Sequence, residues 1–332
     1  MIVLAADIGG TSTRLALCKQ NGKGFRVVSE DKFVSAEYPG LCAILESFLS
    51  GKSGKVDRAC FGIPGPVTGE IIELANLPWK IDVKALKQTL KIEQIGLIND
   101  LEANSYGLCE LEDKDFAILN EGTTNPTGNA AIISAGTGLG EAGLHFETAI
   151  KIRHPFASEG GHADFAPRNE FEIELLRFLL KKFERVSVER VLSGQGLQNI
   201  YEFLKESKRF EEPAWLEEEI ANGDDTAAII SKNGLERKAE ICEAALRTFA
   251  SIYGAEAGNL ALNMLATGGV FLGGGIAPKI LSVLQEPIFI ESFRAKGRMS
   301  PLLEKIPVRV VLNDKAALLG AAHFAFYEME NS

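Results

Sequence analysis

Short apolar runs separated by glycine turns occupy the start of the chain, a pattern typical of β-strands. Residues 2–6 and 14–18 are joined by a glycine-rich turn, and residues 25–34 continue the pattern. These runs predict a meander of three strands. Helices and strands are then predicted to alternate: a helix at 38–50, a strand at 58–63, a helix at 83–90 and a strand at 95–100. This alternation indicates an α/β fold.

The opening arrangement returns at residues 129–146, NAAIISAGTGLGEAGLHF. An apolar run, a glycine-rich turn with a hydroxyl and a second apolar run follow one another, as they do at residues 2–18, although the letters differ. Two such hairpins suggest two related lobes that face a shared cleft.

The second half of the chain is richer in helical patterns. Asn169 precedes an apolar helical repeat and Glu172 follows three residues later, as in a capping box. The segment GGVFLGGGIA at 268–277 predicts a strand running into a glycine turn that opens a helix. Further helices are predicted near 195–206, 237–256 and 314–328.

Composition and charge exclude several classes of function. The chain has 332 residues, enough for two lobes, and its net charge of −10 argues against a nucleic-acid surface, which needs a basic face. Five scattered cysteines without a CxxC pair favour reduced thiols in a cytoplasmic protein. No basic flank precedes the first apolar run, so no signal peptide is expected. The uncharged, glycine-rich segment 257–278 is a poor membrane span and predicts a buried helix end, turn and strand.

Three glycine-rich turns are candidates for holding phosphate. They are DIGGT at 7–11, AGTG at 135–138 and LGGGIAP at 272–278. GLGEAG at 138–143 also matches a dinucleotide pattern, but a strand-like segment follows it, whereas a Rossmann loop opens a helix. A plain hairpin turn would explain one such loop. Three together favour backbone amides that bind the phosphates of a nucleotide.

Asp7 stands at the mouth of the first loop. A carboxylate beside phosphates is repulsive unless a metal lies between them, and Mg²⁺ usually takes one or two carboxylates with waters and phosphate oxygens. The alternative is an Asx-type turn in which Asp7 accepts the amide of Gly9 or Gly10. With phosphate loops present, we expect Asp7 to hold Mg²⁺ through water.

Polar residues suited to catalysis end the predicted strand at 95–100. Asn99 and Asp100 lie there, and the carboxyl ends of strands line the ligand crevice of α/β proteins. The alternative is that Asp100 only caps a following helix.

A second polar group lies in ASEGGHADFAPRN, which carries Glu159, His162 and Asp164. One histidine without a neighbouring cysteine or second histidine is a weak metal signal. Carboxylates with an imidazole suit a polyhydroxyl ligand, because each carboxylate accepts two hydroxyl protons. Glu189, on a predicted short helix, is a further candidate, and the alternative for it is a solvated surface charge.

Taken in order, the segments DIGGT, LIND, SAGTGLG, EGGHADF, ERVLSGQGL and LGGGI resemble bacterial glucokinases of the hexokinase superfamily. The resemblance covers nearly the whole chain, and EGGHADFAP and ERVLSG are specific to that group. It implies an α/β fold of the two-lobed actin-like ATPase (ribonuclease H-like) type, with the active site in the interlobe cleft. It also implies transfer of the ATP γ-phosphate to the 6-hydroxyl of glucose. The expected lobes are 1–104, completed by the C-terminal helix 314–332, and 105–313.

The resemblance implies a role for each matching residue. Asp100 would be the catalytic base. Sugar hydroxyls would be held by Asn99, Asp100, Glu159, His162 and Glu189. ATP would be bound by three loops: Asp7, Ile8, Gly9, Gly10 and Thr11; Gly136, Thr137 and Gly138; and Gly273, Gly274 and Gly275. Ser12 stands where the family usually has asparagine.

The expected ligands are therefore glucose, ATP and Mg²⁺, and a homodimer is expected by resemblance. Closure of the lobes on the sugar would expel water, which is a competing acceptor. A kinase for another hexose, such as mannose or fructose, and a sugar sensor without catalysis remain open. The zinc motif of the related ROK sugar kinases is missing, and the chain begins at the phosphate strand without a helix-turn-helix. The first feature favours the glucokinase group over the ROK kinases, and the second favours an enzyme over a sensor.

Overall fold

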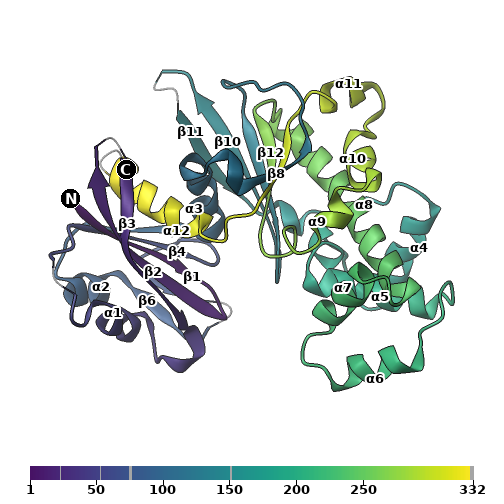
Figure 1. Cartoon of the computed structure of the whole chain (residues 1–332), viewed down its shortest axis with the longest axis horizontal. Helices are drawn as coiled ribbons and strands as arrows, with labels where there is room; N and C mark the ends of the chain where they lie inside the picture. Colours follow the sequence, from purple (N-terminus) through teal and green to yellow (C-terminus); the bar gives the residue numbers. More distant parts are fainter. Residues whose placement is uncertain (23, 53, 75–76, 150–151, 330–332) are drawn as a thin grey trace. The chain divides into compact units, whose positions relative to one another are not determined.

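The chain forms two compact units in a computed structural model that describes residues 1–22, 24–52, 54–74, 77–149 and 152–329 (Figure 1). Unit 1 is Met1–Asp113 with Asn313–Ser332, and unit 2 is Lys114–Leu312. The boundary expected between 104 and 105 lies inside helix α3 (Asp100–Gly107), which belongs entirely to unit 1. Residues 330–332, at the end of the expected range 314–332, lie outside the described residues.

A five-stranded sheet forms the centre of unit 1. Its strands, in spatial order, are β3 (Gly24–Val34), β2 (Ser12–Asn21), β1 (Ile2–Ile8), β4 (Arg58–Ile63) and β7 (Ile95–Asn99). The first three run antiparallel, which confirms the predicted meander, whereas β1, β4 and β7 are parallel. A separate pair is formed by β5 (Ile71–Glu73) and β6 (Lys80–Asp82).

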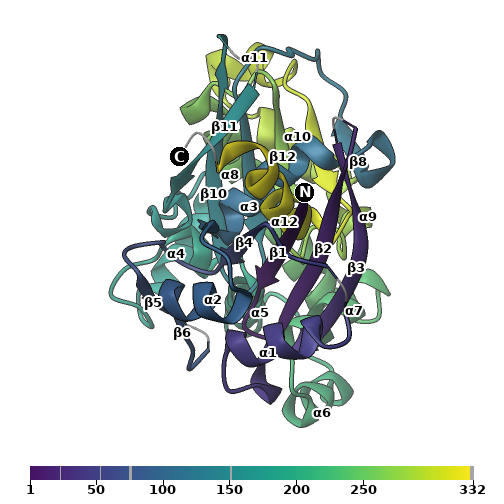
Figure 2. The same ribbon diagram turned by 90° about the vertical axis from the view of Figure 1, so that its left-hand side faces the viewer.

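Alternation along β1 gives the sheet two apolar faces, because successive strand residues point to opposite sides. Leu4 and Ala6 pack with α1 (Leu41–Leu49) and α2 (Val83–Leu90). Val3 and Ala5 pack with α3 and α12 (Ala316–His323). Figure 1 shows α1 and α2 on one side of the strands and α12 on the other, and Figure 2 shows them turned by 90°. Asp7 continues the series of Val3 and Ala5, so it belongs to the α3 and α12 face.

Helices α3 and α12 approach closely because glycines stand where they meet. A Cβ added to Gly320 would lie 1.7 Å from the carbonyl oxygen of Ala103, and one added to Gly107 would lie 2.0 Å from that of Ala316.

Gly320→Ala must push the helices apart, and we expect it to lower the free energy of unfolding by about 1–3 kcal/mol. Denaturant unfolding measures the loss. Gly40→Ala is the control, because an added Cβ there meets no atom within 4 Å. Equal stability of the two variants would contradict the close contact.

The sheet of unit 2 repeats the sheet of unit 1 and adds a strand. Its order is β11 (Ile152–Ser158), β10 (Leu139–Glu147), β9 (Ala130–Ala135), β12 (Gly269–Gly273), β13 (Val308–Val311) and β8 (Phe116–Asn120). The first three are antiparallel, β9, β12 and β13 are parallel, and β8 is an antiparallel edge. Five strands therefore repeat the order and directions of unit 1, which confirms the internal repeat predicted from the two hairpins.

Helices make up most of the remainder of unit 2. They are α4 (Glu170–Leu179), α5 (Gly194–Glu206), α6 (Ala214–Asn222), α7 (Thr226–Leu235), α8 (Glu240–Met264), α9 (Leu281–Leu284), α10 (Pro287–Arg294) and α11 (Ser300–Leu303). Short 3₁₀ turns occur in both units. Unit 1 has η1 (Ser35–Glu37) and η2 (Leu108–Glu110), and its helix α12 continues into a π-turn, η7 (Phe324–Glu328). The turn η3 (Asp113–Asp115) spans the boundary, and unit 2 has η4 (Gly160–His162), η5 (Val188–Arg190) and η6 (Gly297–Met299).

The predicted capping box at α4 is half correct. Asn169 is the N-cap, and its Oδ1 accepts the Glu172 N–H at 3.0 Å. The Glu172 carboxylate, however, accepts the N–H of Arg168 at 2.8 Å and not that of the cap residue itself. The side chain turns back one residue further because it also forms an ion pair with the Arg168 guanidinium.

The uncharged segment 257–278 forms the end of α8, a turn and β12, as predicted. Of the helices in the described ranges, none has the length and apolar character needed to span a membrane. The expectation that LGGGIAP opens a helix is wrong. Residues 274–280 form consecutive turns, and α9 begins only at Leu281.

Candidate active site

Asp7, Asn99 and Asp100 lie at one edge of the unit 1 sheet, where the parallel strands β1, β4 and β7 end. Asp7 pairs in register with Gly62 of β4, and Gly62 pairs with Ile98 of β7. The carboxyl ends of parallel strands form the ligand crevice in open α/β sheets. The residue between the two outer strands is glycine, and α3 packs closely over it: a Cβ added to Gly62 would lie 3.1 Å from the Cβ of Ala103.

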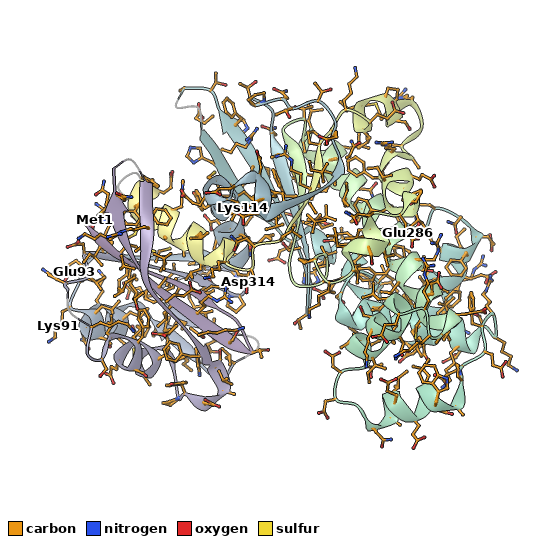
Figure 3. All side chains as sticks on the ribbon, viewed as in Figure 1. Met1, Lys91, Glu93, Lys114, Glu286 and Asp314 are labelled. Atoms are coloured by element: carbon orange, nitrogen blue, oxygen red, sulfur yellow. The ribbon has the colours of Figure 1, made fainter. Side chains whose placement is uncertain are left out.

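Burial and neighbouring charges both act on Asp7. Burial, and next the carboxylate of Asp100, raise the pKa of Asp7 to about 6. Arg14, its cross-strand partner, acts in the opposite direction, and Asp314 adds to the rise. Arg14 Nη2 donates to Asp314 Oδ2 at 2.7 Å, and this bond lowers the pKa of Asp314. Asp7 of β1 and Asp314, in the segment before α12, thus lie near one guanidinium, and Asp314 is labelled in Figure 3.

The start of α3 differs from the prediction. Asn99 is the N-cap, and its Oδ1 accepts the Leu101 N–H at 2.9 Å. Asp100 is the first helical residue, and its Oδ1 accepts the same N–H at 2.8 Å. The Asn99 amide also donates to the Gly65 carbonyl at 3.0 Å. The alternative that Asp100 is the cap is therefore wrong, and Asn99 fixes both the helix start and the loop at Gly65.

The first glycine loop is a tight turn held from behind. The Gly9 N–H donates to the Ser12 carbonyl at 2.9 Å, so this amide is used within the hairpin. The buried Ser35 hydroxyl donates to the Gly9 carbonyl at 2.8 Å, and the Ser35 N–H donates to the Thr11 carbonyl at 3.1 Å. Across the described ranges, the N–H groups of Gly10 and Thr11 meet no protein acceptor. These two amides are the ones that can bind an anion.

Ile8 and Ser12 flank this turn in different ways. The Ile8 side chain is 1% exposed and belongs to the core beside α1, so only its backbone can contact a ligand. Ser12 closes the turn through its carbonyl oxygen. This backbone function of Ser12 does not depend on its side chain.

The second glycine loop, in unit 2, is built in the same way. The Gly136 N–H donates to the Gly138 carbonyl at 2.8 Å, and the Gly194 N–H at the start of α5 donates to the Gly136 carbonyl at 2.9 Å. The N–H groups of Thr137 and Gly138 find no acceptor in the part of the chain that the structure describes. Each hairpin therefore presents two adjacent amides at its turn that form no hydrogen bond among the described residues, which is the form of an anion nest.

The third glycine loop lies against the second. Gly274 has φ of +78°, and a Cβ there would lie 2.4 Å from the Ala135 carbonyl oxygen at the end of β9. The Ile276 N–H donates to the same oxygen at 3.2 Å. Residues 273–275 and 136–138 are therefore neighbours at the carboxyl ends of β12 and β9, where open α/β sheets bind nucleotides.

Glu159 and His162 lie in and beside η4, in the loop after β11. Both side chains are exposed, and Glu159 Oε2 lies 3.9 Å from His162 Nε2. Gly161, between them, packs on the second hairpin: an added Cβ would lie 2.1 Å from the Leu139 carbonyl oxygen. The predicted sugar loop and the predicted phosphate hairpin therefore touch through their backbones.

Glu189 joins the same contact from η5. Its Oε2 accepts the Leu139 N–H at 3.0 Å, so the alternative of a solvated surface charge is wrong. Asp164, the third acidic or imidazole side chain of the EGGHADF segment, forms an ion pair with Arg185 at 2.6 Å. Arg185 also donates to the His162 carbonyl. Asp164 therefore supports the loop and is separate from the residues gathered at Leu139.

Arg14, Ser35 and Asp314 support this site but are not among the residues predicted from the sequence. A signal for Asp314 exists, because the Asn-Asp pair after β7 recurs after β13 as Asn313-Asp314. The geometry recurs as well: Asn313 Oδ1 accepts the Lys315 N–H at 3.0 Å, as Asn99 does at α3. The repeated Asn-Asp pair is a trace of the repeated sheet.

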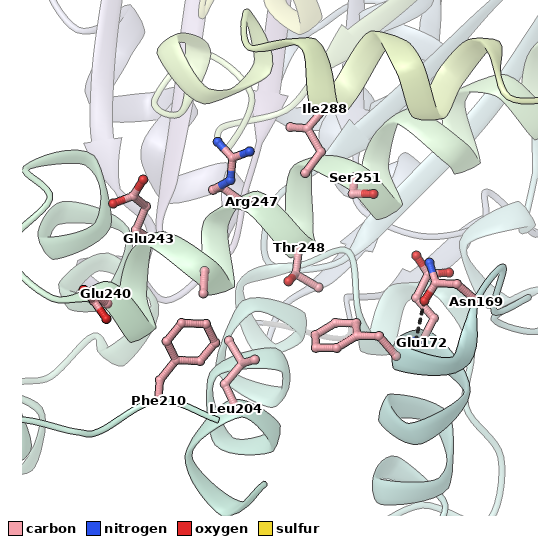
Figure 4. Close-up of a pocket in the computed structure, with 12 residues that line it drawn as sticks. Asn169, Glu172, Leu204, Phe210, Glu240, Glu243, Arg247, Thr248, Ser251 and Ile288 are labelled. Carbon is pink, nitrogen blue, oxygen red and sulfur yellow. Dashed lines mark hydrogen bonds between the residues drawn. The ribbon is translucent and has the colours of Figure 1, made fainter. Parts of the chain in front are cut away.

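A separate pocket of about 730 Å³ lies among α4, α5, α8 and α10 (Figure 4). It is lined by Asn169, Phe171, Glu172, Leu204, Phe210, Glu240, Glu243, Ala244, Arg247, Thr248, Ser251 and Ile288. None of the residues predicted for catalysis or binding is among them.

Within the described ranges, no group of three or more histidine, cysteine or acidic side chains is arranged to hold a metal.

Comparison with solved structures defines the class of protein. The structure of a glucokinase from an Antarctic psychrotroph has a TM-score of 0.86 and 32% identity, covering 100% of this chain and 99% of that chain. A ROK family glucokinase from Streptomyces griseus, solved with glucose and AMPPNP, has a TM-score of 0.64 and 20% identity, covering 98% of this chain and 99% of that chain. The fold is that of the two-lobed, actin-like sugar kinases, as predicted.

The sequence comparisons narrow the class to one family. The glucokinase family profile matches residues 4–327. The glucokinase of Nostoc punctiforme is 42% identical over 341 residues, which cover 97% of this chain and 98% of that protein. The chain belongs to the glucokinase family, and its activity is the ATP-dependent phosphorylation of glucose to glucose 6-phosphate. The other two possibilities, a kinase for another hexose and a sensor without catalysis, are not favoured.

Proposed function

We propose that Asp100 is the general base that takes the proton of the glucose 6-hydroxyl as its oxygen bonds to phosphorus. Asp100 lies at the carboxyl edge of the unit 1 sheet. It is the first residue of α3, and the Leu101 N–H donates to its Oδ1, which holds the carboxylate in place. Phosphoryl transfer depends mainly on positioning and charge neutralisation, so a fixed base in such a place is sufficient.

The ATP phosphates are assigned to the four amides that the two hairpins leave open, at Gly10 and Thr11 and at Thr137 and Gly138. Amides arranged in this way bind anions without a lysine. The loop Gly273–Gly275 is assigned to the border of the adenosine. There is open space for a ligand beside Gly275, because a Cβ added there would meet no atom within 4 Å.

Mg²⁺ is assigned to Asp7, through water. The chemistry of the site fits a cation, because Asp7 is a desolvated carboxylate whose pKa is raised by burial and by Asp100, and a positive charge would offset both effects. When bound, the cation would neutralise charge on the transferring phosphates. Arg14 and Asp314 keep the edge of the sheet ordered around Asp7.

Glucose hydroxyls are assigned to Asn99, Glu159, His162 and Glu189, with Asp100 at the reacting hydroxyl. Each carboxylate accepts two hydroxyl protons. Glu189 uses Oε2 for the Leu139 N–H, so its Oε1 is the atom assigned to the sugar.

The contact at Leu139 is the observation that carries this proposal. Its N–H donates to Glu189, and its carbonyl oxygen packs against Gly161 of the EGGHADF segment. Leu139 directly follows the phosphate hairpin, so groups assigned to sugar and to phosphate share one backbone segment. Reaction between two substrates requires that they be held within reach of one another.

A coupled assay with purified protein, ATP, Mg²⁺ and a panel of hexoses tests the proposal. We expect turnover with glucose and formation of glucose 6-phosphate, with weaker turnover of mannose and fructose. Equal turnover of all three hexoses would contradict selection by Glu159 and Glu189. Absence of turnover with every hexose would favour a sensor.

The proposal includes a cytoplasmic location, a homodimer and a place in glycolysis. These parts rest on the resemblance to the glucokinase family and on the need for ATP. Size-exclusion chromatography with light scattering tests the dimer directly.

A further inference from the structure

Beneath the loop Glu159–His162 lies a carboxyl group that the proposed mechanism does not use. Glu141 on β10 pairs in register with Ser158 on β11, and its side chain is 4% exposed. Its Oε1 has no hydrogen-bond partner among the described residues. Buried polar atoms are nearly always satisfied, so an exception calls for a functional explanation.

The carboxyl group of Glu141 packs directly against the loop. A Cβ added to Gly160 would lie 2.2 Å from Glu141 Oε2 and 3.0 Å from its Cδ. The Gly160 N–H donates to Ser158 Oγ at 2.9 Å, and the Gly160 carbonyl accepts the Ala163 N–H at 2.8 Å. The position of Gly160 therefore depends on both cross-strand partners, Glu141 and Ser158. Gly160 is the first residue of η4 and directly follows Glu159.

We propose that Glu141 is a positioning residue for the sugar-binding loop: its uncharged carboxyl group supports Gly160, and ionisation of that group displaces the loop and weakens glucose binding. This inference rests on the proposed roles of Glu159 and His162 in binding glucose.

The neighbours of Glu141 disfavour its charge. Burial, and then the carboxylate of Glu256 on α8, raise the pKa of Glu141 to about 8. Tyr253, also on α8, is a second titratable group close to Glu141. Lys296 does not compensate, because its Nζ donates to Asn259 Oδ1 at 2.5 Å, and Asn259 Nδ2 in turn donates to Glu256 Oε2 at 3.0 Å. The positive charge is thus directed toward Glu256.

The residues paired with Glu141 on the two neighbouring strands carry no charge. The register partners of Glu141 are Ile133 on β9 and Ser158 on β11. The carboxyl group therefore stays protonated at neutral pH and fits beneath Gly160 as an uncharged group. Above about pH 8, a buried carboxylate forms with an unpartnered oxygen, and movement of the loop that packs on its Oε2 would open the carboxylate to water.

The pH dependence of the glucose KM in the unmodified chain is the first test. If only the protonated form binds glucose, KM rises about tenfold between pH 7 and pH 9, because the competent fraction falls by that factor. The KM for ATP should not follow. In Glu141→Gln the glucose KM should be constant over this range, because glutamine has the same shape and does not ionise. Glu147→Gln, on the same strand, is the matched control and should keep the native profile.

Thermal stability gives a second readout that does not depend on activity. The folded chain holds a proton on Glu141 that the unfolded chain loses above about 4.5, the ordinary pKa, so stability falls as pH rises from there to about 8. The difference between the Tm of Glu141→Gln and the native Tm should therefore increase in favour of the variant from about pH 4.5 to about pH 8 and stay constant above that.

Each outcome decides the matter. Failure to phosphorylate glucose at any pH would overturn the proposed function and this inference with it. Phosphorylation of glucose with a KM that is constant from pH 7 to pH 9 in the native chain would overturn the inference alone, whether or not the variant folds. The inference would also be overturned if the glucose KM of Glu141→Gln still rose from pH 7 to pH 9. It would likewise be overturned if the KM for ATP rose together with the glucose KM, because a parallel rise indicates a general structural effect.

Discussion

Asp100→Asn is expected to lower kcat by about two orders of magnitude or more, with a much smaller change in glucose affinity. Asparagine keeps the size of the side chain and an oxygen for the Leu101 N–H, which Asp100 accepts at 2.8 Å. Helix α3 should therefore begin as before. What is lost is the ability to take a proton from the sugar hydroxyl. Steady-state kinetics with varied glucose at saturating ATP measure both quantities.

Asp82→Asn is the matched control for this change. Asp82 is an N-cap in the same unit, and its side chain accepts the N–H groups of Lys84 and Ala85 at the start of α2. Asparagine is an equally good cap, so both kcat and Tm should remain native. If Asp100→Asn also kept its native kcat, Asp100 would only support α3, and the base would have to be sought elsewhere.

The repeated strands could be predicted from the sequence because their signal is local. Apolar alternation fixes which residues face the core, and the two hairpins carry it at 2–18 and 129–146. Element ends were less predictable, since caps decide them. At α3 both Asn99 and Asp100 are good capping residues, and only the structure shows that Asn99 holds the position while Asp100 begins the helix.

Long-range contacts of the site could not be predicted in this way. Arg14 pairs with Asp314 across 300 residues of chain, and Glu189 accepts the Leu139 N–H across 50. A single sequence contains no signal that joins such distant positions. Glu189 is instructive, because from its neighbours alone it is an ordinary surface carboxylate.

The glycine pattern also indicates where phosphate loops lie without showing which amides they offer. Gly9 and Gly136 are central to the two motifs, yet their N–H groups close the turns themselves. The open amides are those of the following residues. This distinction depends on backbone hydrogen bonds, which follow from the register of the strands on either side.

Glu159→Gln is expected to weaken glucose binding strongly. The Glu159 side chain is 78% exposed, beside His162, so the change cannot disturb a packed core. A site built to accept hydroxyl protons loses a charge-assisted hydrogen bond, which costs on the order of 1.5–3 kcal/mol. The glucose KM should therefore rise about 10- to 150-fold, while nucleotide affinity stays close to native.

Two further variants separate sugar binding from loop structure. Asp164→Asn is the control from the same segment. Asparagine keeps an oxygen that can accept from Arg185, so the loop should stay in place and the glucose KM should stay close to native. Glu189→Gln should raise the glucose KM as Glu159→Gln does, since the glutamine oxygen can still accept the Leu139 N–H. Each variant is titrated once with glucose and once with a non-hydrolysable ATP analogue. If affinity for the analogue collapsed while glucose affinity held, Glu159 and Glu189 would serve the nucleotide, and the assignment of sugar and phosphate groups would have to be exchanged.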